Sequence, residues 1–220
     1  MKKKVIIVAG GNGSRMGASM PKQFLMLKNK PILYYSIKAF LDAFDDIEIV
    51  LVLPEEYLGL GQEIVDAYFD ADKIQITMGG ETRFHSVKNG LQFIDEECIV
   101  MVHDAVRCMV TPKLIQELYD EAVFSGAVIP VVSATDSIRI VTEKGSETLD
   151  RNIVKIVQTP QAFYSKILLP AFNIDYKEKF TDEASVVEAF GVTVHLIDGD
   201  INNIKITTPK DLIIAESTMV

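Results

Sequence analysis

Cysteines, basic residues and long apolar runs are all scarce in this sequence, and each shortage excludes a class of protein. Cys98 and Cys108 are the only two cysteines and lie ten positions apart, so neither the paired spacing of a zinc site nor a disulfide framework is available. The formal net charge of −9 argues against nonspecific nucleic-acid binding, because that requires a broad basic surface. The apolar run after the basic start Met1–Lys4 is shorter than a secretory core or a membrane span. We therefore expect a cytoplasmic protein with reduced thiols that binds neither nucleic acids nor membranes.

The composition is that of one globular domain. The chain has 220 residues, of which 48% are hydrophobic and 24% charged, enough to bury a full core. No internal repeat, low-complexity tract or long linker divides it. Residues 1–220 are therefore expected to form a single domain.

Short apolar runs alternate with segments of helical periodicity along the chain. Runs typical of buried strands lie at Val5–Val8, Ile47–Leu53, Ile74–Thr77, Ile99–Val102, Ala127–Val132 and Val192–Ile197. Segments predicted to be helical lie at Ile32–Phe44, Glu56–Phe69, Arg83–Ile94, Pro112–Ser125, Ser165–Phe172, Asp182–Phe190 and Pro209–Ser217. This alternation predicts an α/β sandwich with a mainly parallel sheet.

Residues 133–157 interrupt the alternation. They are predicted to form a β-hairpin with strands Ser137–Val141 and Thr148–Ile156 around a turn at 143–146. A two-stranded ribbon on its own is only marginally stable in water. We therefore expect this arm to pack on another subunit.

The segment from Ala9 to Gln23 carries the clearest chemical signal. It follows a predicted strand and contains four glycines together with Arg15 and Lys22. The glycines are Gly10, Gly11, Gly13 and Gly17. Glycines let backbone N–H groups approach an anion closely, and the two cations add charge where a phosphate would lie. The segment is therefore predicted to hold a nucleotide triphosphate.

Two familiar glycine-rich motifs do not fit this segment. A dinucleotide-binding fingerprint that starts at Gly11 would need its third glycine at position 16, which is Met16. A P-loop would end in Gly-Lys-Ser/Thr, which the sequence lacks. A plain surface loop is the remaining alternative, but it leaves Arg15 and Lys22 unexplained.

Three further strand ends carry polar residues. This placement matters because ligands of open parallel sheets bind beyond the carboxyl ends of the strands. Gly79–Ser86 opens a helix with backbone donors and a hydroxyl group, and His103–Arg107 supplies an acid and bases. Lys205 and Thr207 lie two apart and are expected on one face of a short strand.

Together these segments resemble the 4-diphosphocytidyl-2-C-methyl-D-erythritol synthases, the cytidylyltransferases of the non-mevalonate isoprenoid pathway. The matching stretches follow the order of that family: the opening loop through Pro21-Lys22-Gln23, Gly79-Gly80 with Arg83 and Ser86-Val87, His103-Asp104-Ala105 with Arg107, Asp136-Ser137-Ile138, Thr159-Pro160-Gln161, Thr181-Asp182-Glu183-Ala184-Ser185 and Asn203-Ile204-Lys205-Ile206-Thr207. The resemblance implies a Rossmann-like nucleotidyltransferase that joins CTP to 2-C-methyl-D-erythritol 4-phosphate, releases pyrophosphate and uses Mg²⁺.

The resemblance also implies residue roles. Arg15, Lys22 and Lys205 would surround the α-phosphate as catalytic cations, and Asp104 would lie at the Mg²⁺. The nucleotide would be bound at Ala9, Gly10, Gly11, Gly13, Gly80, Glu81, Ser86 and Ala105. The methylerythritol phosphate would be held by Arg107, Arg151, Thr181 and Thr207.

The chemistry of the reaction agrees with such a cationic site. A phosphate-monoester nucleophile is already ionised at neutral pH, so catalysis can rest on positioning and on cationic stabilisation. Arg83 is expected to add to this positive potential. Thr181 has a second expected role, as the N-cap of the helix that follows it.

The family pattern further implies a homodimer with exchanged arms, in which Arg151 completes the polyol-phosphate site of the partner. Three positions depart from that pattern. Glu81 stands where aspartate or serine is common, Cys108 replaces a usual proline, and Ser137 replaces a usual threonine.

Two other functions stay open at this point. A sister family loads CMP onto ribitol 5-phosphate, and the glycine-rich loop and Lys205 would serve that reaction as well. A non-catalytic nucleotide-binding regulator on the same fold is the second alternative. Such a regulator would be expected to lack Arg15, Lys22 or Lys205, all of which are present.

Overall fold

The computed structural model describes residues 1–9 and 20–219, so Gly10, Gly11, Gly13 and Arg15 lie outside the described residues. The strands are β1 Lys2–Val8, β2 Met26–Leu27, β3 Lys30–Pro31, β4 Ile47–Leu53, β5 Ile74–Met78, β6 Cys98–Asp104, β7 Ala127–Ser133, β8 Ile138–Thr142, β9 Gly145–Leu149, β10 Lys155–Val157, β11 Gln161–Tyr164 and β12 His195–Asp198. The α-helices are α1 Ile32–Ala43, α2 Leu58–Tyr68, α3 Arg83–Leu91, α4 Pro112–Ser125, α5 Ser165–Ala171, α6 Glu183–Ala189 and α7 Pro209–Thr218. Short 3₁₀ helices lie at η2 Lys22–Phe24, η3 Glu55–Tyr57, η4 Ala71–Lys73 and η5 Arg151–Ile153. Within the described ranges, no helix is both long and apolar enough to cross a membrane.

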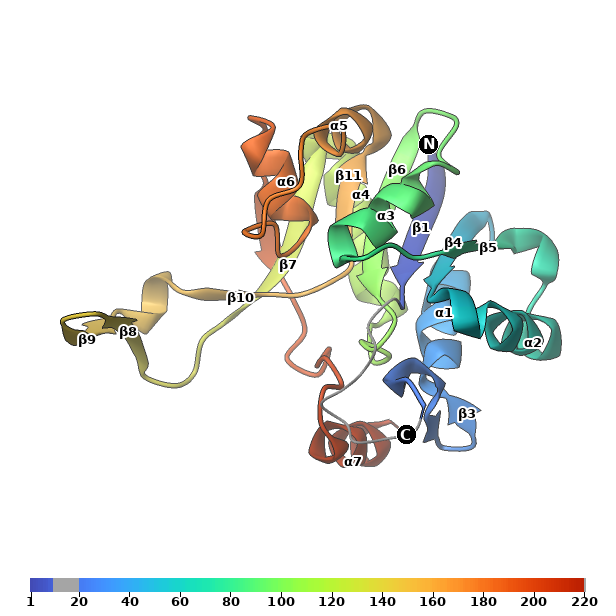
Figure 1. The fold of residues 1–220 in the computed structure, drawn as a ribbon, viewed down its shortest axis with the longest axis horizontal. Coiled ribbons are helices and arrows are strands. Elements are labelled where there is room, and N and C mark those ends of the chain that lie inside the picture. Colours follow the sequence, from blue (N-terminus) through green and yellow to red (C-terminus); the bar gives the residue numbers. More distant parts are fainter. Residues whose placement is uncertain (10–19, 220) are drawn as a thin grey trace.

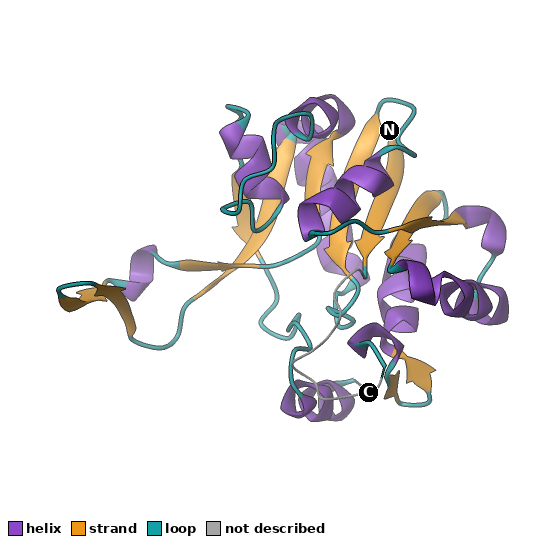
Figure 2. Ribbon diagram, viewed as in Figure 1, coloured by secondary structure: helices purple, strands orange, loops and turns teal. Residues whose placement is uncertain are grey.

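The predicted α/β sandwich with a mainly parallel sheet is confirmed (Figures 1 and 2). The eight-stranded sheet has the order β10-β7-β11-β6-β1-β4-β5, and β12 pairs with β7. β1 lies parallel between β4 and β6, and β4 pairs parallel with β5. β11 runs antiparallel between β6 and β7. The carboxyl ends of β1, β4 and β6 therefore meet at one edge of the sheet.

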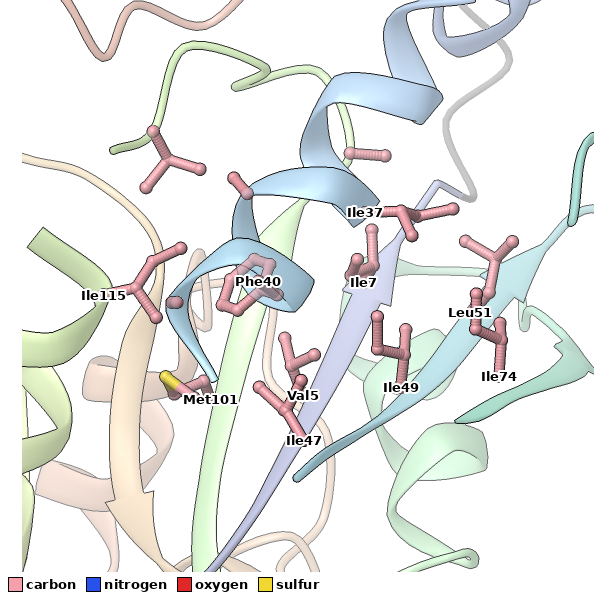
Figure 3. Close-up of a cluster of buried hydrophobic side chains, with 14 of the residues drawn as sticks. Val5, Ile7, Ile37, Phe40, Ile47, Ile49, Leu51, Ile74, Met101 and Ile115 are labelled. Carbon is pink, nitrogen blue, oxygen red and sulfur yellow. The ribbon is translucent and has the colours of Figure 1, made fainter. Parts of the chain in front are cut away.

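Two layers of helices cover the two faces of the sheet, because side chains alternate between faces along each strand. Val5 and Ile7 of β1 belong to one buried cluster together with residues of α1, α2 and α4. Figure 3 shows Phe40 and Ile37 of α1 lying over these two side chains and over neighbours from β4 and β6. Ile6 of β1 belongs to a second cluster with residues of α3, α5 and α6. This two-sided burial explains why the central strands are continuous apolar runs.

A third, smaller cluster lies away from the sheet. Leu27, Ile32, Cys108, Ile206 and Ala215 are its buried members. They join the β2–β3 ribbon, the turn after β6 and helix α7, which Figure 1 shows apart from the sheet. This third cluster fixes the loop before α7 at the carboxyl edge of the sheet.

Two predicted strands had wrong limits, and one strand was missed. Lys155 and Ile156, predicted as the end of the second hairpin strand, instead form β10 together with Val157 and pair antiparallel with β7. The late strand begins at His195 rather than Val192, because Val192 and Val194 pack against the second cluster without pairing. β11 was not predicted, since a run of four residues beside Pro160 has no readable periodicity.

The arm is a hairpin, as predicted, but a shorter one. β8 and β9 pair antiparallel from Ile138↔Leu149 to Thr142↔Gly145. Figure 1 shows this hairpin projecting away from the sheet and its helices. Val141 is 82% exposed and Ile153, in η5, is 73% exposed. The arm thus leaves apolar side chains in solvent in the single chain.

Gly90 permits the close approach of α3 to the sheet, and we expect Gly90→Ala to destabilise the fold. A Cβ at this position would lie 2.7 Å from Ile6 Cγ2 and 3.1 Å from Val52 Cγ2, both of them buried. Overpacking costs about 1–3 kcal/mol, which outweighs the gain of about 1 kcal/mol in helix propensity. Gly59→Ala is the matched control, since nothing lies within 4 Å of its Cβ position in α2. Urea unfolding should show a lower midpoint for Gly90→Ala and an equal or higher one for Gly59→Ala. Equal midpoints in both variants would contradict this reading of the α3 contact.

Candidate active site

Asp104 is the last residue of β6 and lies at the carboxyl edge of the sheet. It pairs with Val8, the last residue of β1, and its side chain is buried. The ladder continues one residue further, where Ala105 N–H donates to the Val8 carbonyl at 3.0 Å and Ala9 N–H donates to Val52 at 2.9 Å. The sheet therefore brings the predicted residues Ala9, Asp104 and Ala105 together.

Three cations surround the Asp104 carboxylate. Arg83 Nε donates to Oδ1 at 3.1 Å, and Lys205 Nζ lies 2.8 Å from Oδ2. Arg107 Nε lies 3.8 Å from Oδ2. Burial alone would raise the pKa of Asp104, but Arg83, Lys205 and Arg107 outweigh it and hold this pKa well below its usual range. Asp104 is therefore ionised at neutral pH.

Arg83 binds a second buried carboxylate besides Asp104. Its Nη1 and Nη2 both donate to the carboxylate of Glu183, the latter at 3.0 Å to Oε2, while Nε is used for Asp104. Glu183 is the first residue of α6 and its side chain is only 1% exposed. Burial raises the pKa of Glu183, and the bidentate pair with Arg83 opposes that rise. Arg83 thus bridges two buried carboxylates.

The loop before α7 brings Lys205 to Asp104. The short strand predicted around Lys205 and Thr207 is absent from the described residues there, so that expectation was wrong. Ile206 anchors the loop instead, with its side chain in the third cluster and its N–H donating to the Val106 carbonyl at 2.9 Å. Lys205 remains 42% exposed at its side chain.

Lys22 joins the same group of residues through the loop before α7. It begins η2 and is buried, and its Nζ donates to the Ile206 carbonyl at 3.2 Å. Gln23 Nε2 donates to the Ala9 carbonyl at 2.6 Å. η2 therefore ties the end of the glycine-rich segment to both β1 and the Lys205 loop.

Arg107 is held by backbone on two sides. Nη1 donates to the Asn203 carbonyl at 2.8 Å, and Nη2 donates to Val157 at 3.4 Å. Its Nε is buried and has no hydrogen-bond partner among the described residues. Nε therefore interacts with Asp104 through charge alone, at 3.8 Å from Oδ2.

His103 supports the site without exchanging protons near neutral pH. Burial lowers its pKa to about 3, so the ring is neutral. The Thr159 hydroxyl accepts from Asp104 N–H at 3.0 Å and lies 3.1 Å from His103 Nδ1, to which it donates. That leaves Nε2–H to donate to the Arg107 carbonyl at 3.3 Å. His103 therefore helps to fix the turn that carries Arg107.

The segment after β5 packs closely against the start of α3 at Gly80. A Cβ on Gly80 would lie 2.5 Å from His85 Cβ, so only glycine fits there. Gly80 N–H donates to Ser86 Oγ at 3.1 Å, and Ser86 Oγ donates to the Thr82 carbonyl at 3.0 Å. Glu81 is exposed. Ser86 thus shapes the loop through its own hydrogen bonds.

The remaining predicted residues lie at the margins. Thr207 donates its hydroxyl to Asp211 Oδ2 at 2.8 Å, within the cap of α7. Thr181 is exposed, and the N-cap of α6 is Asp182 rather than Thr181, because Asp182 and Ser185 form a reciprocal capping box. Arg151 lies on the arm, where its Nη1 donates to Thr135 at 2.7 Å. Arg151 begins η5, which lies between β9 and β10 in the arm that Figure 1 shows projecting away from the sheet.

Glu183 is the functional candidate that the sequence analysis missed. It lies within the matching stretch Thr181–Ser185, but that stretch was interpreted as a helix N-terminus capped by Thr181, which left Glu183 without a role. Its contact with Arg83 depends on α3 and α6 covering the same face of the sheet. Gln161 completes this junction, donating to Asp182 Oδ2 at 2.9 Å and accepting from Ala184 N–H at 2.9 Å.

Two further observations concern possible ligand sites among the described residues. Within the described residues, no group of three or more His, Cys, Asp or Glu side chains could hold a metal ion. A groove of about 500 Å³ lies elsewhere, and it is lined by Thr111, Lys113, Leu114, Glu117, Val131, Val132, Ser133, Asp198, Gly199, Asp200 and Ile201. None of the predicted site residues lines this groove.

Comparisons with known proteins point in one direction. Residues 4–220 match the model of a family described as 2-C-methyl-D-erythritol 4-phosphate cytidylyltransferase. A protein of that name from Phocaeicola vulgatus is 47% identical over 216 residues, covering 98% of this chain and 99% of the relative. The crystal structure of 4-diphosphocytidyl-2C-methyl-D-erythritol synthase from Anaerococcus prevotii is similar with a TM-score of 0.84 at 26% identity, covering 98% of this chain and 97% of that one. The Francisella tularensis 2-C-methyl-D-erythritol 4-phosphate cytidylyltransferase has a TM-score of 0.81 at 34% identity and full coverage of both chains.

Neither cysteine is expected to be reactive in the folded protein. Burial raises the pKa of Cys108 to about 12 and also raises the pKa of Cys98. Because the thiolate is the reactive form, a disulfide reagent at about pH 8 should modify neither thiol in the native chain. Both should react in concentrated guanidinium chloride, which is the internal control. Rapid modification of one thiol in the native protein would show that its site is open to solvent.

Proposed function

Since the chain belongs to the 2-C-methyl-D-erythritol 4-phosphate cytidylyltransferase family, we propose that the cluster around Asp104 is where it joins CTP to 2-C-methyl-D-erythritol 4-phosphate in isoprenoid synthesis. The observation that carries this assignment is the convergence of Lys22, Arg107 and Lys205 at the carboxyl edge of the sheet. Such a concentration of positive charge in a protein of net charge −9 suits two anionic substrates.

The reaction needs little from a general base. A phosphate oxygen of the polyol phosphate attacks the α-phosphorus of CTP, the bond from that phosphorus to the bridging oxygen breaks, and pyrophosphate leaves. Negative charge builds on the equatorial oxygens of the α-phosphate, where Lys22 and Lys205 would act together with Arg15. His103 is neutral and buried, in keeping with the absence of a proton-transfer step.

We assign the divalent metal of this reaction as Mg²⁺ and its protein ligand as Asp104. Mg²⁺ is commonly bound by one or two carboxylates together with substrate phosphates, so a site with a single ionised carboxylate fits it. When bound, the metal neutralises the triphosphate and aligns it. Lys205 is partly exposed, so it is able to exchange its contact with Asp104 for a phosphate oxygen.

The two substrates are assigned to opposite sides of Asp104. The nucleotide side comprises Ala9, Gly10, Gly11, Gly13, Gly80, Glu81, Ser86 and Ala105. The N–H groups of Ala9 and Ala105 are used within the sheet and their carbonyls accept from Gln23 and Ser36, so these two residues would contribute close packing. The polyol-phosphate side comprises Arg107, Thr181, Thr207 and Arg151. The charge of Arg107 and its place beside Asp104 support this placement.

The arm, about residues 133–157 of the single domain, is assigned to dimer formation. Its exposed Ile140, Val141, Ile153 and Ile156 would be buried if each arm crossed to the other subunit. Arg151 would then enter the site of the partner. This arrangement gives a use to apolar side chains that the arm leaves exposed in the single chain.

A pyrophosphate-release assay tests the proposed function. Each of the four ribonucleoside triphosphates is combined with 2-C-methyl-D-erythritol 4-phosphate or with ribitol 5-phosphate. Release with CTP and methylerythritol phosphate alone is the expected result. Preferred turnover of ribitol 5-phosphate would assign the chain to the sister activity, and no turnover with any pair would remove the catalytic assignment.

Lys22→Ala and Lys205→Ala should lose turnover far more than CTP binding. A cation that acts on developing transition-state charge contributes about 2.7–4 kcal/mol, roughly a hundred- to a thousand-fold in kcat. Lys210→Ala is the matched control, because Lys210 is an exposed lysine of the neighbouring α7. Steady-state kinetics and calorimetric CTP binding separate the two effects. Near-parental kcat in both variants would exclude these lysines from the mechanism.

Mixed dimers test the shared site directly. Mixing an Arg151→Ala chain with a Lys22→Ala chain should restore activity, because exchanged arms create one site in which both residues are intact. The control mixes Lys22→Ala with Lys205→Ala, which both belong to the body of the chain and should not complement. If subunit exchange is verified and no activity returns in the first mixture, Arg151 acts within its own subunit or not at all.

A further inference from the structure

The contact between Arg83 and Glu183 has no role in the assignments above. We propose that Glu183 is a positioning residue for Asp104. Glu183 acts through Arg83 and keeps one Asp104 oxygen available to Lys205 and to a metal-bound nucleotide. This inference rests on the proposed function of the Asp104 cluster. It concerns how that carboxylate is held.

The geometry divides the Arg83 guanidinium between two carboxylates. Nη1 and Nη2 donate to Glu183, and Nε donates to Asp104 Oδ1. Asp104 Oδ2 is left to Lys205 at 2.8 Å. Glu183 begins α6, Arg83 begins α3 and Asp104 ends β6, so one guanidinium connects three elements at the edge of the sheet.

Helix capping does not explain Glu183. The N-terminus of α6 is already capped by Asp182, which accepts from Ser185 N–H at 3.0 Å. Gln161 accepts from Ala184 N–H at 2.9 Å and satisfies a second donor. Nor does stability require a buried ion pair here, because well-packed apolar side chains are commonly as stable as such a pair. The carboxylate of Glu183 is thus best explained by what it does to Arg83.

Without Glu183, Arg83 would compete for Asp104. A guanidinium binds a carboxylate most strongly through two parallel N–H donors. The two terminal nitrogens of Arg83 would lose their buried partner and would turn towards Asp104, the other carboxylate in reach. A bidentate pair there would occupy both Asp104 oxygens and displace Lys205. Glu183 prevents this by holding the terminal nitrogens away.

Glu183→Gln is the direct test, because the amide keeps the size of the side chain and removes its charge. We expect kcat/KM for CTP to fall about tenfold or more, with the Mg²⁺ concentration for half-maximal CTP binding raised several-fold. The KM for methylerythritol phosphate should change less than about twofold, since the Arg83–Glu183 contact acts on Asp104 and not on the residues assigned to the polyol phosphate. Glu188→Gln is the matched control, as Glu188 is an exposed glutamate of the same helix. It should behave like the parent protein.

A paired apolar variant separates positioning from packing. Arg83→Met combined with Glu183→Met removes both charges and fills the same space. The double variant contains no arginine that could turn towards Asp104 from this position. If Glu183 acts by holding Arg83 away, the double variant should fold, by thermal unfolding, and its Mg²⁺ concentration for half-maximal CTP binding should stay within about twofold of the parental value. A several-fold rise in that concentration would mean that the pair does not act by keeping Arg83 from Asp104. This variant also decides the question if Glu183→Gln does not fold.

The outcomes distinguish this proposal from the proposed function. Parental kcat/KM and Mg²⁺ dependence in Glu183→Gln, or a several-fold higher Mg²⁺ requirement in the double variant, would overturn the positioning role. Absence of pyrophosphate release in the parent protein itself would overturn the proposed function instead. Calorimetric binding of CTP with Mg²⁺ would still report on Glu183 in that case.

Discussion

The candidate active site depends on one buried carboxylate. Taking an ionised Asp104 out of water costs several kcal/mol unless cations and hydrogen bonds compensate for it. The compensation comes from α3, from the turn after β6 and from the loop before α7, through Arg83, Arg107 and Lys205. Those three segments must therefore meet at the end of β6. The requirement to neutralise one charge fixes the layout of the whole edge.

The sequence was sufficient to predict the central sheet and most helices. Strands buried on both faces must be continuous apolar runs, and Ile47–Leu53 has the same limits in the prediction and in the structure. The antiparallel β11 was missed, because its placement between β6 and β7 comes from long-range pairing and not from its own four residues. The segment around Lys205 was predicted to be a strand from its local alternation, although it makes no strand pairing within the described part of the chain. Its alternation reflects a single buried anchor, Ile206, in a loop.

The candidate site was partly predictable. Asp104 could be identified because it ends a strand at the carboxyl edge of the sheet, and Lys205 because it lies in a stretch that matches the family pattern. Arg83 was expected only to add to the positive potential of the site. The structure pairs it with Glu183, and only the packing of α3 and α6 over one face could reveal that contact. Sequence patterns indicate which charges are near a site, whereas packing decides which charges neutralise one another.

The wide spacing of these residues along the chain has a consequence for synthesis on the ribosome. Arg83 and Glu183 are separated by 100 positions, and Lys205 follows still later. A growing chain has β1, β4, β6 and α3 long before the groups that complete the Asp104 cluster emerge. During that interval Asp104 has only the arginines of its own half as partners. The site is therefore completed only when Glu183 and Lys205 have been translated, so a chain terminated before them would display the sheet edge without the complete Asp104 cluster.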